Sequence, residues 1–172
     1  MINKGDILGL IAGRRARRPA RTLPFLDALF RRLAWCKPAE APATEDEIWS
    51  VWMDHPHAEA ARALDLATRD IAARRYDIAE TRLVLLLRRA PDFAEAWHKR
   101  ATLYYLLHRD RECLHDIRRT LELEPRHFAA ILHFAEILLG AGAAGDARFA
   151  VFAALSLHPF HPRAREILSN KA

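Results

Sequence analysis

The sequence predicts an all-α fold, and three observations carry the prediction. Of 172 residues, 32 are alanine and 24 are leucine, which are the two best apolar helix formers. Valine, isoleucine and threonine, which favour strands, number only 19 together. Pro91, Pro125 and Pro159 recur at a constant spacing of 34 residues. A fixed period of this length indicates supersecondary units stacked in series.

The period of 34 also aligns four columns of side chains. Two columns hold small residues and two hold apolar residues. The members are Ala67, Ala101 and Ala135; Ala79, Cys113 and Ala147; Ala63, Trp97 and Ile131; and Leu83, Ile117 and Val151. Small side chains let two helices approach closely, and each helix pair leaves an apolar face that only stacking can bury. The columns therefore predict three consecutive helix hairpins.

Residues 1–43 are expected to form a basic N-terminal segment. Residues 1–37 carry a net charge of +7, whereas the rest of the chain carries −2. One face of an amphipathic helix is predicted by apolar residues at i, i+3, i+4 and i+7, namely Leu26, Leu29, Phe30 and Leu33. One reading of the segment is a solvated basic tail followed by this helix docked on the chain's own repeats. Pro38 and Pro42, among small residues, predict a linker.

The repeat domain is expected to span residues 44–172. Thr44 with Glu47 matches a capping box and predicts a leading helix over 44–54, which we expect to cover the front of the first unit. The three units fall at about 58–91, 92–125 and 126–159. Residues 160–170 read as a helix that caps the last unit.

These columns resemble the tetratricopeptide repeat (TPR) family, and the second unit resembles it best through Trp97, Ala101, Tyr104, Cys113, Ile117 and Pro125. The chain is similar to short bacterial TPR proteins with three repeats. The resemblance implies a right-handed α-solenoid with N-terminal helices and a C-terminal cap. The family's glycine between the two helices is present only as Gly142, because Arg74 and His108 replace it in the other units.

The resemblance also implies which residues face the concave groove, because the first helix of each unit lines it. The expected partner-binding residues are Asp65, Thr68, Glu95, His98, Lys99, Thr102, Tyr105, Leu132, His133 and Glu136. This mixed charged, aromatic and apolar surface suits an extended peptide or a helix of a partner. We therefore expect a protein-interaction module, an adaptor or scaffold, with a protein or peptide partner.

Two alternative functions stay open at this stage. One is a chaperone for secretion or assembly, of the three-TPR type. The other is a membrane-surface tether in which the basic N-terminal helix contacts an anionic membrane; the same helix could serve self-association. Nucleic-acid binding is disfavoured, because the arginine cluster has no aromatic platform or recognised motif beside it.

No catalytic residue, metal site or cofactor is expected. The nine histidines include no pair at i and i+4 on a helix, and the two cysteines lack zinc spacing. Cys113 and the aromatic residues Trp97 and Tyr104 stand on packing columns, so we expect them in the core. His115 and Asp116 are expected to form a surface pair. Two distant cysteines fit a reducing compartment, and we expect a cytoplasmic location.

Overall fold

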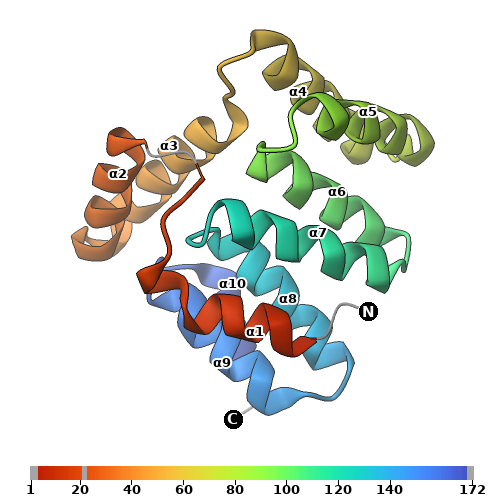
Figure 1. Cartoon of the computed structure of the whole chain (residues 1–172). Helices are drawn as coiled ribbons and strands as arrows, with labels where there is room; N and C mark the ends of the chain where they lie inside the picture. The colour runs from red at the N-terminus through yellow and green to blue at the C-terminus, as the bar shows by residue number, and fades with distance from the viewer. Residues whose placement is uncertain (1–3, 21–22, 170–172) are drawn as a thin grey trace.

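The computed structural model describes residues 4–20 and 23–169, and all regular structure within these ranges is helical (Figure 1). The α-helices are α1 (Lys4–Ala12), α2 (Pro24–Trp35), α3 (Ala41–Met53), α4 (Ala58–Ala72), α5 (Tyr76–Arg89), α6 (Ala94–Leu106), α7 (Asp110–Leu123), α8 (Phe128–Gly140), α9 (Ala144–Leu155) and α10 (Pro162–Ser169). The short 3-10 helices η1 (Arg14–Ala16) and η2 (Pro38–Glu40) lie between the first three. The predicted all-α solenoid of helix hairpins is confirmed.

Helices α4 to α9 form three hairpins whose internal turns repeat in detail. Arg74, His108 and Gly142 occupy equivalent positions and have φ of 57°, 55° and 74°. In each turn the next residue donates its backbone N–H to the carbonyl five residues earlier, over 2.8, 2.8 and 2.9 Å. This is the Schellman arrangement, which requires a left-handed residue. The arginine and histidine therefore adopt the conformation that glycine provides in the third unit.

The three periodic prolines lie in equivalent turns between hairpins. In each turn a backbone N–H donates to the carbonyl three residues earlier. The bonds run from Phe93 to Ala90, from His127 to Glu124 and from His161 to His158, over 3.2, 3.1 and 3.2 Å. Each proline precedes its next helix by three residues. None of these three prolines enters the first turn of the next helix, because the tight turn is completed before the helix begins.

The predicted columns form the interior of the hairpins. All members of both small-residue columns, and all members of the Leu83 column, have fully buried side chains. Ala63 and Trp97 of the remaining column are only partly buried. The Nε1 of Trp97 donates to the carbonyl of Pro91 over 2.9 Å, and its ring lies near the guanidinium groups of Arg100 and Arg119. Close packing of small residues therefore sets the hairpin spacing, while this tryptophan covers an edge.

The N-terminal segment is a structured layer of the fold. Helix α1 packs against α7 and α9 and buries Ile7 and Ile11 (Figure 1). The chain then crosses the edge of the solenoid, where the backbone N–H of Ala20 donates to Leu123 over 2.7 Å. The expected tail is therefore docked over residues 4–20.

Helix α3 begins at Ala41, earlier than the predicted start at residue 44. Thr44 lies inside the helix, where its hydroxyl donates to the carbonyl of Glu40 over 3.2 Å, so the predicted capping box does not form. Pro42 occupies the first turn, where a missing N–H costs nothing. The expected linker is correspondingly reduced to η2.

At the other end, α10 packs on α9 and buries Ala164 and Ile167.

Candidate partner-binding groove

An open hollow of about 340 Å³ lies between α6, α8 and the start of α10. Its lining comprises His98, Thr102, Tyr105, Ala129, Leu132, His133, Glu136, His161 and Arg163. Six of the ten residues expected in the groove meet here: His98, Thr102, Tyr105, Leu132, His133 and Glu136. They meet because the first helices of the second and third units present the same register positions side by side.

The floor of the hollow is neutral. Burial lowers the pKa of His133 to about 4, so its imidazole is uncharged at neutral pH. Its Nε2 lies 3.9 Å from the Sγ of Cys113, and burial raises the pKa of that thiol to about 12. The edge of the partly exposed Tyr105 ring meets the His133 ring at a centroid distance of 4.7 Å. This floor offers an apolar surface with an unreactive thiol beneath it.

The rim of the hollow carries paired charges. The Arg163 Nε donates to Glu136 over 2.7 Å, and its Nη1 donates to Glu166 over 2.9 Å. These two hydrogen bonds raise the pKa of Arg163 above its ordinary value. The hydroxyl of Thr102 donates to the carbonyl of His98 over 3.1 Å. A bound segment would therefore meet an apolar floor and a rim with little net charge.

The other four expected residues lie outside this hollow. Asp65 pairs with Arg69 one helical turn away on α4 over 2.9 Å, and the hydroxyl of Thr68 donates to the Leu64 carbonyl over 2.9 Å. Glu95 is buried, and its Oε1 lies 3.1 Å from the Nζ of Lys99. The ten positions thus do not form one continuous open face.

Helix α3 occupies the part of the inner face that Glu95 would otherwise line. The Trp49 ring lies 6.2 Å from the His98 ring, and the Nζ of Lys99 lies 5.0 Å from the Trp49 centroid. The carboxylate of Glu45 meets the Nε2 of His158 at 2.9 Å, which lowers the pKa of Glu45. This position differs from the expected cover over the front of the first unit.

The first unit remains partly uncovered as a result. Ile78 and Leu85 on α5 are about half exposed. A second hollow of about 340 Å³ runs between α4 and α5, with Ala60, Ala63 and Leu86 in its lining.

The sequence carried one signal for the actual place of α3, the tryptophans at i and i+3, but their contact surface depends on residues far along the chain.

The amphipathic face of α2 is buried within the chain. Leu26, Leu29, Phe30 and Leu33 are all buried. The Phe30 ring lies 6.4 Å from the Phe128 ring, and the Asp27 carboxylate accepts a bond from Arg126 over 2.6 Å. Only the opposite side of α2 can meet another molecule without unfolding this layer.

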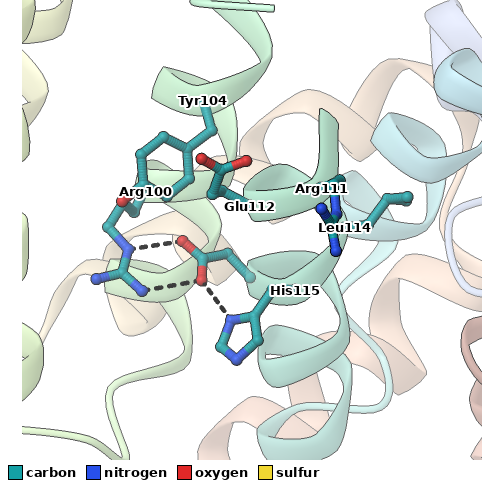
Figure 2. Close-up of a pocket in the computed structure, with 7 residues that line it drawn as sticks. Arg100, Tyr104, Arg111, Glu112, Leu114 and His115 are labelled. Carbon is teal, nitrogen blue, oxygen red and sulfur yellow. Dashed lines mark hydrogen bonds and ion pairs between the residues drawn. The ribbon is translucent and has the colours of Figure 1, made fainter. Parts of the chain in front are cut away.

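Figure 2 shows a third hollow, of about 460 Å³, in which an ion pair joins α6 to α7. Arg100 donates to both carboxylate oxygens of Asp116 over 2.6 and 2.9 Å, and His115 Nδ1 lies 2.9 Å from the same carboxylate. Asp116 is buried, so the expected surface pair is wrong. The helix pairing buries this carboxylate, and Arg100 supplies its counter-charge.

Comparison with known proteins adds one relative. No family model matches the chain. The chain is 34% identical over 118 residues to a TPR repeat-containing protein of Rhizobium etli, and the match covers 68% of this chain and 58% of that protein. The chain thus spans little more than half the length of this relative. Across residues 4–20 and 23–169, none of the helices has both the length and the apolar character needed to cross a bilayer.

Proposed function

Because this chain is built of tetratricopeptide repeats, we propose that it is a protein-interaction module that binds a short partner segment in the hollow between α6, α8 and α10. The observation that carries the proposal is that six of the ten residues expected in the groove surround an open volume of about 340 Å³. Volumes of this size lie within the range of ligand pockets. The hollow can accept one or two side chains of a partner.

The chemistry of the lining favours an apolar or aromatic anchor on the partner. Ala129 and Leu132 provide apolar surface, and Tyr105 provides a ring edge. Thr102 and the neutral His133 can orient polar groups at the margin. Because α3 covers the neighbouring part of the inner face, the bound segment is shorter than a groove-spanning helix. A buried anchor in a pocket with a polar margin is the usual form of an interaction hot spot.

Site-specific photocrosslinking in the native host tests the proposal. A photoreactive residue at Tyr105 should capture a discrete partner, whereas the same residue at Leu106 should not. Leu106 is the matched control, since it follows on the same helix, is similarly exposed and does not line the hollow. Equal capture at both positions, or capture only at Leu106, would contradict the proposal.

A second candidate, contact with an anionic membrane surface, rests on the outer side of α2. Phe25 and Trp35 are 61% and 91% exposed there, and Arg31 is also exposed. Aromatic and basic side chains together favour a membrane interface. Sedimentation with anionic vesicles should fall when Trp35 is replaced by alanine and persist for Phe152→Ala, whose exposed ring lies on α9. Equal binding by both variants would remove this candidate.

A further inference from the structure

Beneath α3, three side chains that can bind a metal ion converge in the interior. Glu95 and His98 stand at i and i+3 on α6, and His127 is the N-cap residue of α8. All three are buried, and one potential ligand atom from each lies within 4.8 Å of the others. The Nε2 of His127 lies 2.7 Å from Glu95 Oε2, and the Nδ1 of His98 lies 3.4 Å from the same oxygen.

This cluster contains buried polar atoms without hydrogen-bond partners. His98 Nδ1 has only the 3.4 Å contact with Glu95 Oε2, and Glu95 Oε1 has only the ion pair with Lys99. Such atoms are uncommon in protein interiors and call for an explanation, for which an ion is one recognised answer. Both atoms are also shielded from solvent, so bulk water cannot act as their hydrogen-bond partner.

We propose that Glu95, His98 and His127 bind a divalent transition-metal ion, with zinc as the first candidate. Two imidazole nitrogens and one carboxylate form a donor set that binds zinc and related metals. Two ligand atoms that each lie about 2.1 Å from a tetrahedral zinc ion are about 3.4 Å apart. The His98–Glu95 separation of 3.4 Å matches this value, whereas the His127–Glu95 separation of 2.7 Å must lengthen when the ion binds.

The surroundings suit a bound ion. Trp49 and Trp52 pack against the histidine rings, and Phe128 packs against both tryptophans. An apolar shell of this kind limits water access and strengthens ligand binding. The remaining coordination positions would be filled by water or by the second oxygen of Glu95. The sequence signal is the Glu95-x-x-His98 spacing, which differs from the i and i+4 histidine pair of helical zinc motifs.

Metal binding requires two local changes, and the first provides a readout. The N–H of Ala130 donates to His127 Nδ1 over 3.2 Å, so a neutral ring carries its proton on Nε2 and donates it to Glu95. Coordination through Nε2 moves that proton to Nδ1 and gives up the bond from Ala130. Lys99, whose side chain is 20% exposed, must also leave the carboxylate for solvent.

The proposal is tested by titrating zinc into the chelator-treated full chain and measuring the heat of binding by calorimetry. The unmodified chain should bind one equivalent, and Glu95→Gln and His98→Asn should each weaken binding by at least about 100-fold, the upper end of the loss caused by removing an outer-sphere partner. His57→Asn is the matched control, because His57 is exposed and distant from the cluster in sequence, and it should bind like the unmodified chain.

Glu95→Gln keeps an acceptor for His127 Nε2, so it is expected to fold, and circular dichroism checks both variants. Nitrogen-15 NMR of the histidine rings gives an independent readout, in which zinc should move the His127 proton from Nε2 to Nδ1. The proposal is overturned if the chain binds no zinc, if both cluster variants bind as tightly as the control, or if the His127 proton stays on Nε2 at saturating zinc.

Discussion

The ring of Trp52 stacks on the ring of His127, with centroids 4.1 Å apart and planes 7° from parallel. His127 also bonds to Glu95 on α6 and caps α8, so this one contact joins the N-terminal layer to two repeat units. It fixes α3 on the inner face and thereby decides how much of the groove remains open.

Replacing Trp52 with alanine should lower the free energy of unfolding by about 3–5 kcal/mol, because a large buried side chain is lost and its cavity cannot fully close. Urea denaturation measures the change. Trp35→Ala is the control, since this tryptophan is 91% exposed, and it should cost less than about 0.5 kcal/mol. Similar losses for the two variants would show that α3 is not anchored through Trp52.

The left-handed turn positions predict substitutions of opposite effect. Gly142→Ala should destabilise the chain by about 1–2 kcal/mol, the cost of left-handed backbone for a residue with a Cβ. His108→Gly removes that cost at the equivalent turn and should be neutral or stabilising. Thermal denaturation compares both variants with the unmodified chain. A Gly142→Ala variant as stable as the parent would contradict the positive φ at this position.

The Arg100–Asp116 pair predicts strong coupling between α6 and α7. Arg100→Leu leaves Asp116 buried without its bidentate partner and should cost about 3–5 kcal/mol. The double variant Arg100→Leu, Asp116→Leu removes both charges and should recover much of that loss. A double-mutant cycle in urea measures the coupling energy. Additive single losses would mean that the two side chains do not interact.

Buried histidines predict a loss of stability in acid. His98 and His133 have pKa values of about 4 in the folded chain, below the ordinary value of 6.5. Between these values the unfolded chain binds more protons than the folded one, so the free energy of unfolding falls as the pH drops from about 6.5 to about 4. Urea denaturation at pH 7 and pH 5 measures the slope, and His133→Gln should reduce it. A stability that is equal at both pH values contradicts this prediction.

The repeat units were predictable because their signal is periodic and local. The 34-residue columns located every hairpin, and the left-handed turns fell at Arg74, His108 and Gly142. The N-terminal layer was not predictable in the same way. Burial of Ile7 and Ile11 against α7 and α9 depends on contacts more than 100 residues away, and no local pattern encodes such a surface.

For the candidate groove, the sequence predicted only which residues of the first helices face inward. Whether an inward-facing residue is exposed depends on which other helix packs over it. Thr102 and Tyr105 line the hollow, whereas Glu95 at an equivalent register lies beneath α3. Long-range packing of Trp49 and Trp52 makes that difference.

Affinity measurement with the partner captured at Tyr105 tests whether that partner binds in the hollow between α6, α8 and α10. Ala129→Trp fills the hollow from α8, while Leu106→Ala alters a neighbouring exposed side chain outside it. Ala129→Trp, once shown to be folded, should weaken binding by about tenfold or more, equivalent to about 1.4 kcal/mol, whereas Leu106→Ala should not. Unchanged affinity in the folded Ala129→Trp variant would contradict partner binding in this hollow.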